Sequence, residues 1–411
     1  MLNKLISLGL ILGLIVGLGA SMTGNEILHT VAKTSTPLGQ IFINAVKMVV
    51  IPLVVSVIFT SIARLGDPKK LGSIGVATLT FYCGTLLPAI VIGMGVMFLG
   101  LRFIPEIKMP TNVYSQVPEL QSAVDFIVSL IPANPFSAAS NGQILPLIVF
   151  TALLAAATGT LASEKRKRMV LAAEDFSEAL IKLVWWILYL APLGVFGLVA
   201  SSTALLGWSL IQSLIVFILC VLIGLFLLLA FVFLPMLIIY VKMNMSTFFK
   251  GSFGPASIAF STTSTAAAIP VSLEHTVSKL NVSKQISDML IPLGASIYRP
   301  GSALFQGAAI IFLAHIYDVS LVTSSLGGII FATFLVSLTV APVPSSGVVT
   351  MTPALATIGV PVSGLGLILG IDRIPDMMRS CVNLLGQIAA TIIVEHHIKN
   401  KNQLNNEKTY K

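Results

Sequence analysis

The chain has 411 residues, of which 56% are hydrophobic and only 10% are charged. A soluble globular domain carries about 25% charged residues, so this composition excludes an ordinary water-soluble enzyme or binding module. The formal net charge is +8; anionic lipid headgroups account for such a balance, and no nucleic-acid partner is required. We expect one membrane domain over residues 1–411, because no stretch has the composition of a separate polar domain.

Apolar runs recur along the whole chain at lengths suited to the ~20 residues that cross a hydrocarbon layer of ~30 Å. They cover residues 5–20, 38–62, 74–101, 144–161, 169–206, 210–241, 286–314, 326–357 and 362–394. We expect the first run to be retained as a helix and not cleaved as a signal peptide. The basic clusters then all fall on the cytoplasmic side, provided that 251–275 and 320–360 each enter and leave on the same side. The sequence predicts a multi-pass protein, and its short loops and basic tail favour a bacterial cytoplasmic (inner) membrane.

Two segments interrupt the regular helix that membrane depth demands. Residues 261–270, Ser-Thr-Thr-Ser-Thr-Ala-Ala-Ala-Ile-Pro, lie between apolar stretches and resemble the tip of a helical hairpin. Residues 341–347, Ala-Pro-Val-Pro-Ser-Ser-Gly, place two prolines and a glycine in an apolar stretch, where the helix must break. Each alone is equally well explained by a kinked helix or a surface loop. Two such segments flanking one broken polar span favour a transporter substrate site.

Charged and polar residues also lie inside two of the apolar runs. Arg299 stands at about mid-depth, where a charge is costly unless it is paired or hydrated. In the last run the polar positions are three, four or seven residues apart and share one helical face; they are Asp372, Asp376, Arg379, Ser380, Asn383 and Gln387. A polar stripe in a membrane helix points inward, which predicts either a binding site or an ion-pair network that only joins helices.

Cysteine and histidine give no sign of a metal or catalytic site. Cys83, Cys220 and Cys381 lie inside apolar runs without metal-ligand spacing. The pair His396 and His397 ends the last span and forms no ligand pattern with the other histidines. No nucleophile stands with a base, so we expect no metal, no cofactor and no enzymatic activity.

The order of these features resembles the dicarboxylate/amino acid:cation symporters, the glutamate and aspartate transporter family. The likeness rests on residues 42–52 (Phe-Ile-Asn-Ala-Val-Lys-Met-Val-Val-Ile-Pro), 133–136 (Ala-Asn-Pro-Phe), 142–146 (Gly-Gln-Ile-Leu-Pro), 191–196 (Ala-Pro-Leu-Gly-Val-Phe), 343–347 (Val-Pro-Ser-Ser-Gly) and 376–383 (Asp-Met-Met-Arg-Ser-Cys-Val-Asn). Each motif is weak alone, but in this order they are specific and cover nearly the whole chain.

The resemblance implies an all-α integral membrane protein with eight transmembrane helices plus two re-entrant helical hairpins, assembled as a homotrimer. It implies a scaffold formed mainly by spans 1, 2, 4 and 5 (about 1–65 and 125–205). Spans 3, 6, 7 and 8 and the hairpins (about 72–102 and 209–396) would form a transport core that moves by an elevator-type alternating-access mechanism.

The resemblance also assigns roles by position. Arg379 would pair with the side-chain carboxylate of an acidic amino acid, Asp376 with its α-ammonium and Asn383 with its α-carboxylate. A guanidinium fork matches a carboxylate well, which suits that role. The remaining expected substrate-binding residues are Ser380, Ser302, Ser264 and Thr265, and the expected gate is Pro344, Ser345, Ser346 and Gly347.

Departures from the family pattern fall on its sodium sites. Sodium-coupled members carry Asn-Met-Asp-Gly-Thr where this chain has Tyr-Arg-Pro-Gly-Ser at 298–302, and they carry an aspartate at the position of Gln387. Sodium prefers oxygen ligands and nearby negative charge, so Tyr298, Pro300 and Gln387 are expected to be degenerate sodium-site positions.

A charge count leads to a coupling hypothesis. Arg299 and Arg379 contribute plus two, while Asp376 and an acidic amino acid contribute minus one each, so the loaded site sums to about zero. We therefore expect Arg299 to replace a bound cation, and transport of aspartate or glutamate to be sodium-independent, either proton-coupled or uncoupled. Alternatives are that Arg299 snorkels or pairs with Asp372, and that the protein is a sodium-coupled symporter of the same family, a cystine or neutral amino acid carrier, or an anion channel.

Overall fold

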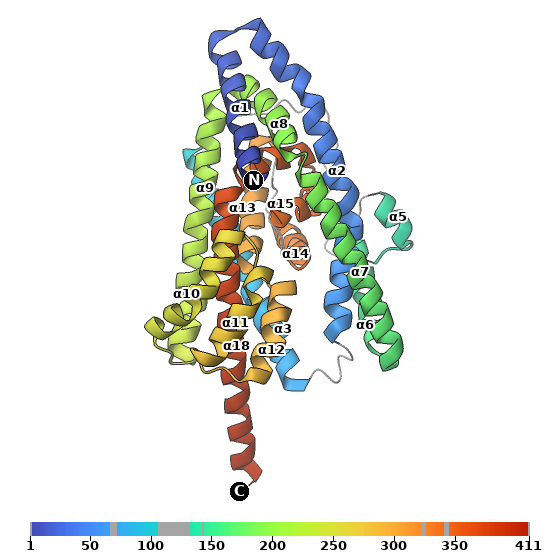
Figure 1. Cartoon of the computed structure of the whole chain (residues 1–411), viewed down its shortest axis with the longest axis vertical. Helices are drawn as coiled ribbons and strands as arrows, with labels where there is room; N and C mark the ends of the chain where they lie inside the picture. Colours follow the sequence, from blue (N-terminus) through green and yellow to red (C-terminus); the bar gives the residue numbers. More distant parts are fainter. Residues whose placement is uncertain are drawn as a thin grey trace.

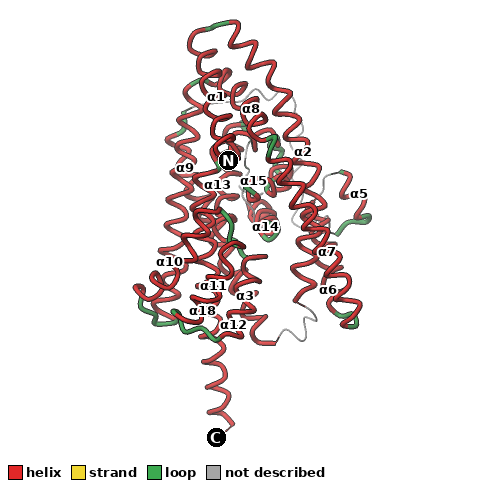
Figure 2. Tube along the Cα trace, viewed as in Figure 1, coloured by secondary structure: helices red, strands yellow, loops and turns green. Residues whose placement is uncertain are grey.

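The computed structural model describes residues 2–65, 72–105, 128, 131–141, 144–319, 321, 326–340 and 345–409. Throughout these residues the regular elements are helices, and no strand occurs among them (Figure 1, Figure 2). The all-α prediction is therefore confirmed for the described part of the chain. The predicted gate residue Pro344 lies outside the described residues, as do residues 341–343 of the second interrupted segment and 142–143 of the quoted motifs.

The amino-terminal half forms the following helices: α1 (Leu2–Thr23), α2 (Glu26–Leu65), α3 (Gly72–Gly100), the 3₁₀ turn η1 (Leu101–Phe103), α5 (Pro135–Ser140), α6 (Ile144–Gly159), α7 (Ser163–Leu188) and α8 (Ala191–Leu206). The next group is α9 (Trp208–Leu228), its π-helical continuations η2 (Leu229–Phe233) and η3 (Met236–Tyr240), α10 (Met245–Thr262), the 3₁₀ turn η4 (Ala266–Ala268) and α11 (Ile269–Ser278). The last group is α12 (Lys284–Ile297), α13 (Pro300–Ile316), α14 (Leu326–Ser337), α15 (Ser346–Thr350), α16 (Thr352–Thr357), the 3₁₀ turn η6 (Val362–Gly364), α17 (Leu365–Ile371) and α18 (Arg373–Thr409).

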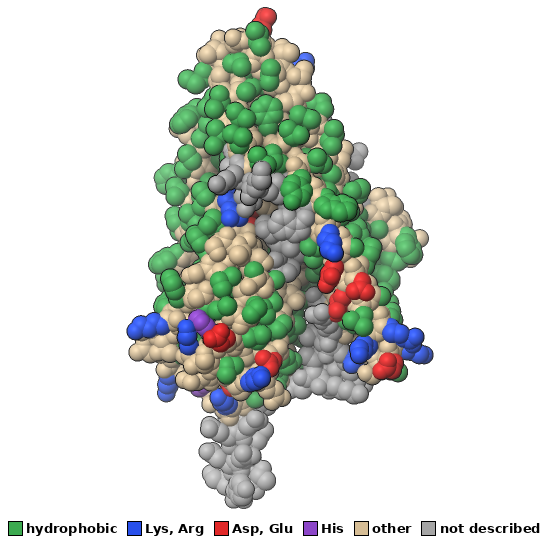
Figure 3. Space-filling view, in the orientation of Figure 1, with side chains coloured by type: hydrophobic (Ala, Val, Ile, Leu, Met, Phe, Trp, Pro, Cys, Tyr) green, Lys and Arg blue, Asp and Glu red, His purple; other side chains and the backbone are tan. Residues whose placement is uncertain are grey.

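Three helical stretches of the described chain are long and apolar enough to cross a membrane: Ile74–Phe103, Trp208–Tyr240 and Arg373–Asn400. Shorter apolar helices accompany them at Leu8–Thr23, Ile51–Thr60, Pro146–Gly159, Ala191–Leu206, Leu326–Ser337 and Val362–Ile371. In Figure 3 hydrophobic side chains spread over the upper part of the visible face, while most of the visible charged side chains gather toward its lower end. This distribution suits a body surrounded by lipid.

Several predicted apolar runs are divided in the structure. The run 169–206 is split between α7 and α8, where Pro192 starts a new helix. The run 286–314 breaks at Tyr298 and Arg299, between α12 and α13, and the run 362–394 breaks at Asp372. In contrast, α2 is continuous over 40 residues, a length of about 60 Å or roughly twice the hydrocarbon thickness, and it runs obliquely in Figure 1.

The helices form two packing groups. In one, α2 lies against α6, α7 and α8, and α1 packs along α8 (Figure 1). In the other, α3, α9, α12 and α10 pack around α13 and α18. The centre of the second group is α13, in which every residue except His315 is buried. This burial makes α13 the axis around which the polar residues of the site are arranged.

Close backbone contact joins α3 to α13. A Cβ placed on Gly93 of α3 would lie 2.0 Å from the carbonyl oxygen of Leu304, and one on Gly307 would lie 2.7 Å from that of Ile90. Small residues let membrane helices approach this closely, and dispersion contacts then hold them together. The pair α3 and α13 therefore packs as one unit.

Two interruptions bring non-helical backbone into the interior. Helix α10 ends at Thr262, Thr263 takes a left-handed conformation (φ 54°), and the chain returns through η4 as α11, which packs beside α10. Helix α14 ends at Ser337, and α15 begins after Ser345, which is also left-handed (φ 56°). The two turns fall within the segments that the sequence marked as interrupted.

We predict that Gly93→Ala destabilises the protein, because the new Cβ collides with the Leu304 carbonyl. Overpacking of this kind costs about 1–3 kcal/mol. Gly95→Ala is the matched control on the same helix, since a Cβ there has no neighbour within 4 Å. Thermal unfolding of the detergent-purified variants measures the difference. A Gly93 variant as stable as the control would show that the two backbones are not in contact.

Candidate functional site

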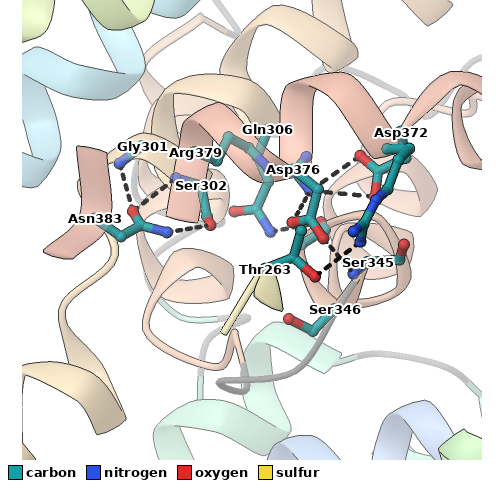
Figure 4. Close-up of polar contacts among 12 residues, drawn as sticks. Thr263, Gly301, Ser302, Gln306, Ser345, Ser346, Asp372, Asp376, Arg379 and Asn383 are labelled. Carbon is teal, nitrogen blue, oxygen red and sulfur yellow. Dashed lines mark hydrogen bonds and ion pairs between the residues drawn. The ribbon is translucent and has the colours of Figure 1, made fainter. Parts of the chain in front are cut away.

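The polar stripe of the last span lies in the interior. Its six positions, Asp372, Asp376, Arg379, Ser380, Asn383 and Gln387, are all buried. Helical periodicity explains this, because positions three, four or seven residues apart share the face of α18 that packs on α13 and α12. Figure 4 shows most of these side chains together with residues from α13 and from the turn before α15.

Arg379 forms two ion pairs through one nitrogen. Its Nη2 lies 2.7 Å from Oδ1 of Asp376 and 2.9 Å from Oδ1 of Asp372. Asp376 lies one turn before Arg379 on α18, and Asp372 lies two turns before it, at the junction with α17. These ion pairs join residues that lie within two helical turns of one another in the sequence. They therefore do not form a network that joins separate transmembrane helices.

Two of the three nitrogens of the Arg379 guanidinium, Nε and Nη1, are buried and have no hydrogen-bond partner among the described residues. Each of them borders an edge of the group that it shares with Nη2. The guanidinium carbon lies 3.8 Å from the centre of the Phe305 ring, which fixes the plane of the group. Buried donors without partners are costly, so these two nitrogens are suited to an anionic ligand.

Asn383 links α18 to the start of α13. Its Oδ1 accepts hydrogen bonds from the amides of Gly301 (2.7 Å) and Ser302 (3.2 Å), and its Nδ2 donates to Oγ of Ser302 (3.1 Å). Asn383 thus satisfies amides at the first turn of α13, which a helix cannot satisfy within itself. A Cβ at Gly301 would lie 3.0 Å from the Arg379 carbonyl oxygen, so the close approach of the two helices favours glycine there.

The turn before α15 is attached to this cluster. The Ser345 amide donates to Oδ2 of Asp376 at 3.0 Å, and Nε2 of Gln306 donates to the Gly347 carbonyl and to Oγ1 of Thr350, both at 3.1 Å. Sequence reasoning missed Gln306 and Thr350. The available signal was the position of Gln306 one turn after Ser302 on an otherwise apolar helix.

The first interrupted segment reaches the same region. Nη1 of Arg373 donates to Oγ1 of Thr263 at 3.3 Å, and Nη2 donates to the Ser261 carbonyl at 3.4 Å. Of the predicted residues there, Thr265 is fully buried with a hydroxyl that has no partner among the described residues, and Oγ of Ser264 accepts from the Ala267 amide. Both turns therefore lie near the start of α18.

Gln387 occupies the position expected of a sodium-binding aspartate. Its Nε2 donates to the carbonyls of Gly294 (3.1 Å) and Tyr298 (2.9 Å). Two carbonyl oxygens that converge in this way are ligands that a hard cation prefers, and here an amide nitrogen meets them. The Tyr298 ring stacks on Tyr82 with centroids 4.1 Å apart, and its hydroxyl hydrogen-bonds Oγ1 of Thr85 at 2.6 Å.

Arg299 is held inside the protein. Only 4% of the residue is exposed, and its Nη2 donates to the Ala295 carbonyl. It is close enough for its charge to act on Asp376, and no ion pair within the described residues involves it. The structure does not support the alternative that Arg299 snorkels or pairs with Asp372, because Asp372 is paired with Arg379.

The buried charges require a correction to the charge count from the sequence. That count left out Asp372, which is fully buried and belongs to the same cluster. Arg299 and Arg379 together balance Asp372 and Asp376, so the empty site is neutral. The acidic amino acid assumed in that count would bring the loaded site to minus one, one positive charge short of neutral.

Comparisons with known proteins agree with this picture. The model of the sodium:dicarboxylate symporter family matches residues 2–397. The chain is 32% identical to a proton/sodium-glutamate symport protein of Bacillus caldotenax, over 98% of this chain and 95% of the relative. It is 27% identical to a proton/glutamate-aspartate symporter of Escherichia coli (96% and 93%) and 30% identical to a C4-dicarboxylate transport protein of Bacillus subtilis (97% and 93%). Because the family match covers almost the whole chain, the protein is a multi-pass membrane transporter, not an enzyme, and it belongs to the sodium:dicarboxylate symporter family.

Proposed function

We propose that this protein is a sodium-independent, proton-coupled symporter of aspartate or glutamate in a bacterial cytoplasmic membrane. The unpartnered Nε and Nη1 of the Arg379 guanidinium carry the proposal. Each of them forms with Nη2 a planar pair of donors, which is the arrangement that a carboxylate fits. The relatives, named for glutamate, glutamate-aspartate and C4-dicarboxylate transport, support a substrate with two carboxylates.

Asp376 supports an amino acid over a plain dicarboxylate. Its carboxylate is shared between Arg379 and the Ser345 amide. When a substrate carboxylate takes over Arg379, Asp376 needs another cationic partner, and the α-ammonium of an amino acid supplies one. The Nδ2 group of Asn383 has a second hydrogen for the α-carboxylate beside the amino terminus of α13, which favours an anion, and Ser302 and Ser380 complete the cradle.

Gln387 and Arg299 support sodium independence. The Gln387 amide already satisfies the two carbonyls that would ligate a cation. Arg299 adds a fixed positive charge, and Pro300 supplies no side-chain ligand beside it. The Tyr298 hydroxyl is already hydrogen-bonded to Oγ1 of Thr85. The protein therefore fits a variant of the family that lacks the usual sodium-site motif.

The proposed architecture has eight transmembrane helices and two re-entrant hairpins in a homotrimer. The hairpins are α10–α11 and the segment from α14 to α15, whose residues 344–347 form the gate. The group built on α2 acts as the scaffold, and the group built on α13 and α18 moves as the transport core. Support comes from the division of most helix contacts between the two groups, which meet where α17 packs on α1 and α8, and from the tight union of α3 with α13.

We predict that L-aspartate binds equally well with choline or sodium in the buffer, within about twofold (less than ~0.5 kcal/mol). Isothermal titration calorimetry of the detergent-purified protein measures both affinities. An absolute requirement for sodium would contradict the proposal.

Arg379→Lys retains the charge but loses the planar fork, so it is expected to weaken L-aspartate binding by at least about tenfold in the same calorimetric measurement.

We predict that Gln387→Glu makes aspartate binding sodium-dependent. The isosteric carboxylate faces the carbonyls of Gly294 and Tyr298, and such a buried charge is costly until a cation joins it. Calorimetry is expected to show about tenfold tighter binding in sodium than in choline. The wild type is the control with an amide at this position, and an equal lack of response in both proteins would count against a vestigial cation site.

We predict that Asp376→Asn separates amino acids from dicarboxylates. The variant keeps an acceptor for the Ser345 amide but loses the charge that pairs with an ammonium. L-Aspartate affinity is expected to fall about 100-fold, as for a broken buried charge pair, whereas succinate affinity is expected to hold or rise. Competition binding with both ligands measures the ratio; parallel losses would argue against an ammonium partner for Asp376.

A further inference from the structure

Asp372 is a buried carboxylate to which the proposed substrate contacts give no role. It is fully buried at the junction of α17 and α18. Among the described residues it pairs with a single cation, Arg379, whose Nη2 it shares with Asp376. Asp376 in turn accepts a hydrogen bond from the Ser345 amide, at the gate turn. The surroundings of Asp372 are therefore set by residues that substrate binding and gate movement rearrange.

The charged groups around Asp372 come from three places. On α18 they are Asp376, Arg379 and Arg373, of which Arg373 is directed to the turn at Thr263. Before α13 stands Arg299, whose charge acts on Asp376. The turn before α15 contributes only the neutral Ser345. These groups are balanced without substrate, so each added negative charge must be compensated.

Substrate binding removes the positive charge that compensates Asp372. A carboxylate that pairs with Nε or Nη1 of Arg379 takes Nη2 as its second donor, so it competes with both aspartates for that nitrogen. Asp376 regains a partner in the substrate ammonium and keeps the Ser345 amide. Asp372 keeps no comparable partner, and an isolated carboxylate in a dry interior takes up a proton in preference to remaining charged.

The other buried carboxylate of the described chain is placed differently. Glu395 lies four turns beyond Arg379 on α18, accepts from the Ser283 amide at 2.9 Å and pairs with Lys399 at 3.0 Å. Both partners are remote from the Arg379 guanidinium, so the substrate does not compete for them. Glu395 serves instead as an internal control.

We infer that Asp372 binds the coupled proton: it is protonated from the outer solution as the substrate displaces it from Arg379, and it releases that proton to the cytoplasm when the substrate leaves. This inference rests on the proposed function. Proton and substrate cross together, and one proton supplies the single positive charge that the loaded site lacks. Afterwards Asp372 returns to Arg379 in the empty site.

The test is calorimetry of L-aspartate binding to the full-length protein in sodium-free buffers of different ionisation enthalpy. The wild type is expected to take up one proton per aspartate. Because rising pH removes the proton that binding needs, affinity is expected to fall roughly tenfold per pH unit on the alkaline side of the Asp372 titration. Asp372→Asn, an uncharged isostere, is expected to bind without proton uptake and without this pH dependence.

Controls separate the inference from the function it rests on. Glu395→Gln removes another buried carboxylate and is expected to retain proton uptake; loss of uptake there, or its persistence in Asp372→Asn, overturns the assignment. Aspartate binding without sodium and without proton uptake in the wild type overturns the assignment and the proton coupling, but leaves a sodium-independent aspartate carrier. No aspartate binding in any buffer overturns the proposed function as well.

A second measurement, on the wild type, tests the inference even if the Asp372→Asn protein does not fold. Infrared difference spectra of the wild type, recorded on adding L-aspartate, are expected to gain the carbonyl band of a protonated carboxylic acid. Glu395→Gln is expected to give the same band. Absence of the band from the wild type overturns the inference.

Discussion

The ion pairs of Arg379 organise the interior of this protein. Nη2 meets carboxylates of Asp372 and Asp376 at 2.9 and 2.7 Å, while the Phe305 ring holds the plane of the guanidinium. Because one nitrogen serves both acids, Nε and Nη1 are left for a ligand. The Ser345 amide reaches the cluster through Asp376, so the position of the second turn is tied to the charge state of α18. Polar groups at this depth are tolerated because each compensates another.

Much of this arrangement was predictable from the sequence, for a physical reason. Polar side chains in apolar helices must face inward, so the spacing from Asp372 to Gln387 located the buried face of the last span. The division of the run 362–394 at Asp372 was not predicted, although Pro375, in the first turn of α18, was an available signal for the start of a new helix. The partners of Gln387 also escaped prediction, since they are backbone carbonyls, which every residue carries. Gln306 was missed because its contact with Gly347 depends on tertiary packing.

Two amide side chains satisfy buried backbone groups in this site. Gln387 satisfies two converging carbonyls, and Asn383 satisfies the first amides of α13. Both hold together a span that is broken at Tyr298 and Arg299, where backbone groups would otherwise lack partners. The break in the chain and the amides that repair it therefore form one structural feature, and a substitution at either amide acts on both helices.

The balance of two buried arginines against two buried aspartates has an electrical consequence. A charge that moves through the full membrane potential exchanges about 2.3 kcal/mol per 100 mV. With four opposing formal charges the buried cluster of the empty site carries no net charge, and under the proposed coupling an acidic amino acid with one proton would leave it neutral as well. Neither half of such a cycle would move charge across the bilayer. The membrane potential would then do no work on the carrier, and accumulation would follow the difference in acidity between the two sides alone.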